Sequence, residues 1–293
     1  MTTDVLLLLA PRINETGLQL LTAARRRGLR AHTAAAWRVP EGLLGPHGLD
    51  DQAGQAPSVH LYGGPLFGDA VGGALGLALL EPPDGWLTGL PFELTRRRVA
   101  CVPLAEARRL RRPAFLKPPA DKFFPARVYP DGSGLPGPDA LDDAIPVLVS
   151  DVVRFRREYR LFVLDGVVRT ASRYALDGEL SVAPLDGDPY RAAVLRFGAE
   201  VLASSAGSLP SAVVVDVGLL GDGPDGPSGS DGPDGPDGQP GWAVVEANAA
   251  WASGGYACDA AAVLDVVLRA AGPAAALAPA DRPYCRELPE VVG

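Results

Sequence analysis

Three oxygen-bearing side chains interrupt two segments that are otherwise rich in valine and alanine. Glu246 and Asn248 end Trp242–Asn248 (WAVVEAN), and Asp216 interrupts Ala212–Leu220 (AVVVDVGLL). If both segments are strands, Glu246 and Asn248 point to the same face, because side chains alternate along a strand. Burying two carboxylates and an amide without partners is costly, and a hard cation such as Mg2+, which takes oxygen ligands, removes that cost. The pattern predicts a magnesium site, with a solvated strand face as the alternative.

The segment between these two strands indicates how they meet. Residues 221–241 (GDGPDGPSGSDGPDGPDGQPG) contain no apolar side chain that could be buried, so we expect a disordered loop. With this insert set aside, the two strands become hairpin neighbours, and Asp216 can face Glu246 and Asn248. The repeated Asp-Gly pairs lack the spacing of calcium-binding repeats, so a calcium site is not favoured.

Lysine is scarce in this chain, which makes its positions informative. The sequence has 25 arginines but only two lysines, Lys117 and Lys122. Since the chain uses arginine wherever a generic cation suffices, a retained lysine indicates a need for a compact point charge rather than a planar fork. The alternative is that both lysines survive by chance on a surface loop.

A two-residue turn at Asp165-Gly166 brings further charged side chains together. Asp-Gly between two β-prone segments is a strong hairpin signal. Direct pairing from this turn puts Arg160 opposite Ala171, Arg173 on the same face, and Glu158 opposite Arg173. Two guanidinium groups beside a carboxylate suit recognition of phosphate or carboxylate. A cross-strand salt-bridge ladder is the alternative.

The segments around these residues predict a chain of three units. Residues 1–90 read as a small α/β domain with a strand at Val5–Ala10, a helix at Glu15–Arg27 and a strand at Val59–Tyr62. A smaller unit at 91–150 and a larger one at 151–293 follow. Helices are expected at Leu104–Arg112, Tyr190–Ser205 and Ala260–Ala271. Further strands are expected at Ala114–Lys117, Val147–Val153, Arg157–Leu164 and Val167–Tyr174.

Composition excludes several classes of function. The net charge of -8 argues against nucleic acid or an anionic membrane as partner. No apolar run is long enough to span a membrane, and Val5–Ala10 follows an aspartate without a basic region, so it reads as a strand and not as a signal peptide. Cys101, Cys258 and Cys285 have no disulfide or zinc spacing and read as small buried side chains, which suits a cytoplasmic protein.

In their order along the chain, these segments resemble the ATP-grasp superfamily, nearest to its ribosomal-protein glutamate ligase-like members. The resemblance covers roughly residues 96–270, and the preceding residues resemble the usual N-terminal α/β domain. The motifs that carry it are FLKP (115–118), PVLVSDVV (146–153), EYRLFVLDGVVRTASRY (158–174), VVVDVGLL (213–220) and VVEANAAW (244–251). The resemblance implies an ATP-grasp fold of α/β and α+β type, with ATP between a lid at 91–150 and the C-terminal unit.

The resemblance also implies a role for each candidate residue. Nucleotide contacts fall to the side chains of Lys117 and Lys122 and to the hinge strand at Val149, Ser150, Asp151 and Val152, whose backbone pairs with adenine. Arg160 and Arg173 are the implied catalytic arginines, and Asp216, Glu246 and Asn248 the implied Mg2+ ligands. Asn248–Tyr256 borders the acceptor site, where Trp251 and Tyr256 either line that site or serve packing.

One segment departs from the pattern of most relatives. Pro118–Tyr129 (PPADKFFPARVY) contains no glycine, whereas most relatives have a Gly-rich loop there that covers the phosphates. A less typical subgroup of the superfamily keeps a second lysine in this segment, and Lys122 fits that subgroup.

The implied activity is ATP-dependent joining of a small-molecule or peptide carboxylate to an amine through an acylphosphate, which forms ADP. The alternatives are a small-molecule kinase on the same fold and a nucleotide-binding regulator without turnover. Retention of Lys117 together with all three metal ligands speaks against the regulator.

Overall fold

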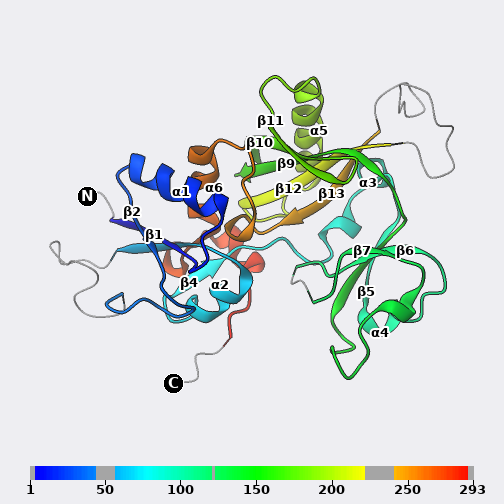
Figure 1. Ribbon diagram of the computed structural model, residues 1–293, viewed down its shortest axis with the longest axis horizontal. Coiled ribbons are helices and arrows are strands. Elements are labelled where there is room, and N and C mark those ends of the chain that lie inside the picture. Colours follow the sequence, from blue (N-terminus) through cyan, green and yellow to red (C-terminus); the bar gives the residue numbers. More distant parts are fainter. Residues whose placement is uncertain (1–3, 44–56, 121–122, 222–240, 290–293) are drawn as a thin grey trace.

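A computed structural model describes residues 4–43, 57–120, 123–221 and 241–289 of the chain (Figure 1). The N-terminal unit is a parallel sheet in which β1 (Val5–Leu9) lies between β2 (Arg30–Thr33) and β3 (Ser58–Tyr62). Leu6–Leu9 are buried, as expected for a strand covered on both faces. Helix α1 (Glu15–Arg26) begins after Asn14, whose side chain accepts a hydrogen bond from Gly17 N, and α2 (Pro65–Val71) follows β3.

The small sheet is antiparallel and has the order β5-β8-β6-β7. Its strands are β5 (Val99–Pro103), β6 (Ala114–Lys117), β7 (Arg127–Tyr129) and β8 (Pro146–Ser150). Two one-turn helices, α3 (Phe92–Thr95) and α4 (Leu104–Ala107), flank β5. Leu104, Leu116, Val147 and Val149 belong to a separate hydrophobic core beneath this sheet. The predicted strand at Ala114–Lys117 is confirmed.

The large sheet is also antiparallel and has the order β11-β10-β9-β12-β13. Its strands are β9 (Phe155–Leu164), β10 (Val167–Leu176), β11 (Glu179–Pro184), β12 (Ala212–Leu220) and β13 (Trp242–Asn248). Helix α5 (Arg191–Ser204) packs on one face through Val194, Phe197 and Val201. Helix α6 (Ala260–Ala270) and the N-terminal unit cover part of the other face.

The end of the chain returns to the N-terminal unit. Strand β14 (Ala271–Pro273) pairs with β4 (Leu77–Leu79), and α6 shares a hydrophobic core with β1 and β3. The short 3-10 turns are Trp86–Gly89, Gly132–Gly134, Ala250–Ala252, Ala274–Ala276 and Pro279–Tyr284. The expected unit at 151–293 therefore contributes its last segment to the core of the first one. No helix within the described ranges is long and apolar enough to cross a membrane.

Two local expectations are wrong. The helix expected at Leu104–Arg112 ends at Ala107 after one turn. Leu110 O instead accepts a hydrogen bond from Gly132 N, and Arg108 donates to the carbonyl oxygens of Pro136 and Leu141, so the loop at 132–141 replaces the later helical bonds. The loop expected at 221–241 lies outside the described residues apart from Gly221 and Gly241.

The second wrong expectation is the register of the β9–β10 hairpin. The turn at Asp165-Gly166 forms as predicted, with both residues at positive φ, but a bulge between Val168 and Thr170 shifts the pairing by one residue. Arg160 therefore lies opposite Ser172 and not Ala171, and Arg173 lies opposite Tyr159 and not Glu158. A one-residue shift sends a side chain to the other face of the sheet.

Candidate active site

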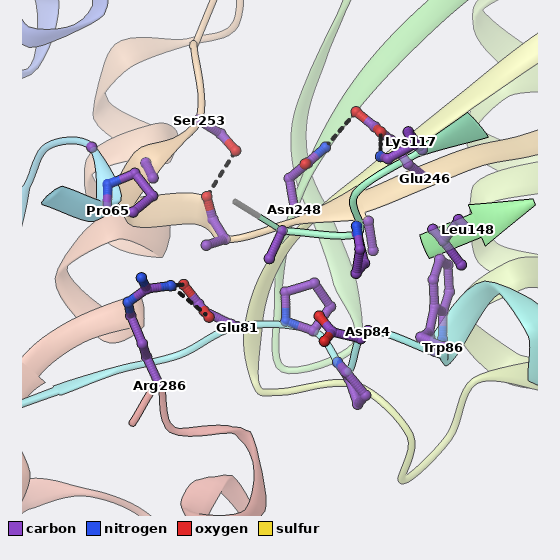
Figure 2. Close-up of a pocket in the computed structure, with 18 of the residues that line it drawn as sticks. Pro65, Glu81, Asp84, Trp86, Lys117, Leu148, Glu246, Asn248, Ser253 and Arg286 are labelled. Carbon is purple, nitrogen blue, oxygen red and sulfur yellow. Dashed lines mark hydrogen bonds and ion pairs between the residues drawn. The ribbon is translucent and has the colours of Figure 1, made fainter. Parts of the chain in front are cut away.

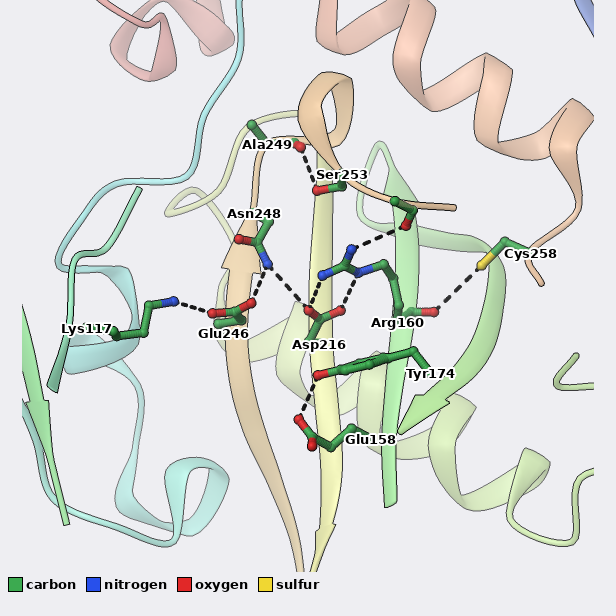
Figure 3. Close-up of polar contacts among 11 residues, drawn as sticks. Lys117, Glu158, Arg160, Tyr174, Asp216, Glu246, Asn248, Ala249, Ser253 and Cys258 are labelled. Carbon is green, nitrogen blue, oxygen red and sulfur yellow. Dashed lines mark hydrogen bonds and ion pairs between the residues drawn. The ribbon is translucent and has the colours of Figure 1, made fainter. Parts of the chain in front are cut away.

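The three predicted oxygen ligands lie together near the end of β13 (Figure 3). Asp216 on β12 is paired with Glu246 on β13, and the Asn248 amide donates to Glu246 Oε1 at 2.8 Å and to Asp216 Oδ2 at 3.4 Å. The predicted juxtaposition on one sheet face is confirmed, whereas metal binding by these residues stays a prediction.

Lys117 reaches this group from the other sheet. It ends β6 and its ammonium group forms an ion pair with Glu246 Oε2 (Figure 3). Burial alone would raise the pKa of Glu246, but the charge and hydrogen bond of Lys117 and the amide of Asn248 bring that pKa below its usual value. Glu246 is therefore an anion that already holds a cation between the two sheets.

Arg160 fills the space beside Asp216. Its Nε and Nη2 donate to the two carboxylate oxygens of Asp216 at 2.9 and 2.6 Å, and its Nη1 donates to Gly254 O at 3.2 Å. Asp216 is fully buried, so this bidentate pair supplies the charge compensation that the interior requires. A guanidinium group has five N–H bonds. One N–H on each terminal nitrogen of Arg160 thus remains without a partner among the described residues.

A cavity of about 890 Å³ opens over these side chains (Figure 2). Lys117, Arg160, Glu246 and Asn248 all line it, whereas Asp216 lies behind Arg160. Other walls come from all parts of the molecule: Gly64–Leu66 and Asp69 of the N-terminal unit, Glu81–Asp84, Trp86, Leu87, Leu148 of the small sheet, and Ala249, Ser253, Gly254, Tyr256 and Arg286. A concave site with mixed apolar and convergent polar groups is typical of small-ligand binding.

A family model of the ATP-grasp domain, described as family 2 of its clade, matches residues 94–266, which is more than half of the chain. The chain belongs to the ATP-grasp family. The matched region begins in α3 and ends in α6, so it contains both antiparallel sheets and every candidate residue named from the sequence.

Solved structures that are similar over most of the chain are also ATP-grasp proteins. The ATP-grasp RimK domain protein from Sphaerobacter thermophilus DSM 20745 is 17% identical, with 90% of this chain and 99% of that chain covered and a TM-score of 0.48. D-alanine–D-alanine ligase from Bacillus anthracis is 13% identical, with 92% and 97% covered and a TM-score of 0.47. The ATP-grasp ligase PsnB, complexed with precursor peptide PsnA2 and AMPPNP, is 14% identical, with 92% and 98% covered and a TM-score of 0.42. A comparison with curated protein sequences finds no match.

The hinge segment of this ATP-grasp chain has one residue with free backbone groups. Val149 and Ser150 are paired with strands on both sides, and Asp151 N donates to Arg98 O. The Asp151 carboxylate is held by the Arg98 side chain at 2.8 and 3.1 Å, which lowers its pKa. Val152 alone of the four predicted residues has backbone N–H and C=O groups without partners within the described part of the chain.

Arg173, the second predicted catalytic arginine, does not reach the cavity. Because of the shifted register it lies on the face covered by α5, where it donates to Ser181 O at 3.1 Å and lies 3.7 Å from Asp188. Asp188 in turn accepts a hydrogen bond from the Tyr159 hydroxyl. The structure separates Arg173 from Arg160, and the expectation of two guanidinium groups on one face is wrong.

Lys122 lies outside the described residues, so its predicted role is neither supported nor contradicted. Its described neighbours Ala120 and Phe123 both line the cavity, as does Pro119. The segment without glycine therefore borders the candidate site on both sides of the undescribed positions.

Two aromatic residues at this site were not predicted from the sequence as functional residues. Trp86 lines the cavity from the 3-10 turn that precedes the small sheet, and Tyr174 lines it from β10. Tyr174 closes one of the quoted motifs, but its orientation depends on a bulge that no residue type announces. Of the two aromatics left open, Trp251 is fully buried and donates to Leu80 O, whereas Tyr256 lines the cavity.

Proposed function

We propose that this ATP-grasp protein is an ATP-dependent, ADP-forming ligase that joins a carboxylate to an amine through an acylphosphate. The observation that carries the proposal is the convergence of Lys117, Glu246, Asn248 and the half-used guanidinium group of Arg160 on one cavity. These groups can neutralise a polyphosphate, hold oxygen-liganded metal and bind an oxyanion, which are the requirements of phosphoryl transfer to a carboxylate.

The residues present fit Mg2+. Glu246 and Asn248 offer oxygen atoms to the cavity, and Glu246 already binds the Lys117 cation. No cluster of three or more His, Cys, Asp or Glu side chains that could enclose a metal occurs within the described ranges. A partial oxygen set suits Mg2+, since this ion keeps waters and substrate phosphates among its ligands. When bound here, it would neutralise charge on the β- and γ-phosphates.

Asp216 has a different contribution from the other two predicted ligands. Both of its carboxylate oxygens accept hydrogen bonds from Arg160, and the side chain does not line the cavity. In the proposed site Asp216 fixes the direction in which Arg160 presents its remaining N–H groups. Direct metal contact by Asp216 would need Arg160 to turn toward the substrate.

The other chain residues supply binding and orientation. Lys117 would hold the transferred phosphoryl group, and the free N–H and C=O of Val152 would pair with the adenine edge. The terminal N–H groups of Arg160 would bind the substrate carboxylate and later the acylphosphate. A carboxylate oxygen attacks the γ-phosphorus and ADP leaves. The neutral amine then attacks the acyl carbon, phosphate leaves, and the amine proton passes to solvent.

An ADP-release screen with hydroxylamine tests the proposal. Candidate carboxylates, including amino acids and short peptides, are incubated with Mg·ATP, and the nucleotide product is identified. We expect ADP and inorganic phosphate, and a hydroxamate when hydroxylamine replaces the amine, because hydroxylamine intercepts the acylphosphate. Release of AMP and pyrophosphate would contradict the proposed chemistry. A stable phosphorylated product without hydroxamate would make the protein a kinase.

A further inference from the structure

Tyr174 reaches the cavity through a second irregularity of β10. The pairing with β9 passes from Arg173 opposite Tyr159 directly to Ala175 opposite Glu158, so Tyr174 has no partner on that strand. The pairing with β11 skips the same residue. This bulge lets the Tyr174 side chain lie across the sheet face that carries Arg160 (Figure 3).

The Tyr174 ring supports the Arg160 guanidinium group. The centre of that group lies 5.6 Å from the Tyr174 ring and 5.1 Å from the Tyr256 ring, both within the range of cation–π attraction. The two rings stack on each other with centroids 5.3 Å apart and planes 12° from parallel. The Tyr174 hydroxyl donates to Glu158 Oε2 at 2.7 Å, which fixes the ring along its length.

Tyr256 is itself held by the N-terminal unit. Its backbone has φ of 48°, a conformation that is uncommon for a residue other than glycine and that neighbouring contacts must maintain. Gly255 N donates to Thr16 Oγ1 at 2.8 Å, and Gln19 donates to Tyr256 O at 3.4 Å. Helix α1 thus sets the position of the ring that meets Tyr174 and Arg160.

We infer that Tyr174 and Tyr256 form an aromatic support that positions Arg160, so that its two unpaired N–H groups face the cavity as a fork for an oxyanion. The inference rests on the proposed function, since the oxyanion is the substrate carboxylate or the phosphoryl group it accepts. Both tyrosines are positioning residues, because they act through Arg160. Asp216 fixes one edge of the guanidinium plane, and the support fixes its tilt.

Inorganic phosphate, a product of the proposed reaction, serves as the probe. Its affinity for the protein saturated with Mg·ADP is measured by calorimetry for wild type, Tyr174→Leu, Tyr174→Phe, Tyr256→Leu and Arg160→Gln. Tyr174→Leu and Tyr256→Leu should each weaken phosphate binding by about tenfold, the loss expected for a desolvated cation–π contact. Tyr174→Phe keeps the ring and should stay within about threefold of wild type. Arg160→Gln should abolish phosphate binding.

Tyr190→Leu is the matched control. Its ring lies 4.9 Å from the Arg157 guanidinium group, an equivalent arginine–tyrosine contact on the α5 side of the same sheet. We expect this variant to lose stability but to bind phosphate as wild type does. The affinity for ADP should stay unchanged in all the tyrosine variants, which a general loss of structure would not allow.

The outcomes separate this inference from the proposed function. Unchanged phosphate affinity in both leucine variants at the site, an equal loss in Tyr190→Leu, or wild type that binds Mg·ADP but not phosphate would each overturn the aromatic support. Failure of wild type to bind Mg·ADP would overturn the proposed function and this inference with it. If Tyr174→Leu does not fold, Tyr256→Leu and the rescue by Tyr174→Phe decide.

Discussion

Lys117 and Arg160 compensate neighbouring carboxylates by different geometries. Arg160 grips Asp216 with two parallel hydrogen bonds in the interior, whereas Lys117 meets Glu246 with one ammonium group at the cavity edge. A fork suits a fixed carboxylate, and a compact charge on a flexible stem suits a group that must transfer from Glu246 to an arriving phosphate. The retention of lysine at this position, in a chain with 25 arginines, agrees with that division.

Substitution of Lys117 tests the division directly. We expect Lys117→Ala to lower ADP release by about 100-fold, the usual cost of losing a donor to developing charge. Lys117→Arg should stay within about tenfold of that low rate, because the planar guanidinium group is too wide for the space beside Glu246. Steady-state ADP release measures both, with the exposed Arg111→Lys as control on the same part of the chain. Full activity of Lys117→Arg would show that any cation serves.

At the scale of elements, regular strands were predictable and irregular ones were not. Alternation along 212–220 and 242–248 predicts which side chains share a face, and the pairing of Asp216 with Glu246 confirms it. The β9–β10 hairpin has an equally clear turn signal, yet its bulges follow from how β10 packs between β9 and β11. Arg173 and Tyr174 exchanged faces for that reason, so the sequence identified one arginine of the site and missed the tyrosine.

Distant contacts set the other limit on prediction from sequence. Arg97 is buried where the small sheet begins and donates to the carbonyl oxygens of Val244 and Val245 on β13. Burial lowers its pKa to about 10, which keeps it charged at neutral pH. Nothing in the run of arginines at 96–98 distinguishes this one, because its partners are backbone groups far along the chain.

The strands β12 and β13 make the insert between them testable. Leu219 pairs with Trp242, and Leu220 N donates to Gly241 O at 2.8 Å, so the ends of the described strands already meet. Replacing residues 222–240 with Asn-Gly should keep the melting temperature or raise it by a few degrees, since a shorter loop costs less closure entropy. Thermal denaturation with and without Mg·ATP measures this. Loss of the Mg·ATP effect would show that the replaced residues contribute to the site.

At the scale of the whole molecule, the candidate site exists only where the three units meet. The cavity takes Gly64 from the N-terminal unit, Lys117 from the small sheet, Glu246 from the large sheet and Arg286 from the returning end of the chain. Arg286 is fixed by ion pairs with Asp69 at 2.7 Å and Glu81 at 3.1 Å. A ligand in this cavity would contact every unit, so its binding should stabilise the molecule as a whole.

Mg·ATP should therefore raise the melting temperature, because a ligand that binds only the native state stabilises it by mass action. At about 100 times its Kd the gain is about 2.7 kcal/mol, which corresponds to several degrees for a chain of this size. The shift has two parts, one seen with ATP and EDTA and one added by Mg2+. Glu246→Ala should abolish the second part, since it removes the anionic oxygen ligand at the cavity edge.

The first part of the shift should survive in Glu246→Ala, because the variant releases Lys117 from its ion pair and leaves that cation available to phosphate. Differential scanning fluorimetry with ATP, with Mg·ATP and with Mg2+ alone separates the two parts, and the exposed Glu200→Ala on α5 is the control. A metal-dependent shift of wild-type size in Glu246→Ala would place the metal away from β13. Loss of both parts would mean that the Lys117–Glu246 pair holds the two sheets in the binding arrangement. Glu246→Gln then decides, because its amide oxygen still accepts a hydrogen bond from Lys117 while the anionic metal ligand is gone, so this variant should keep the first part and lose the second.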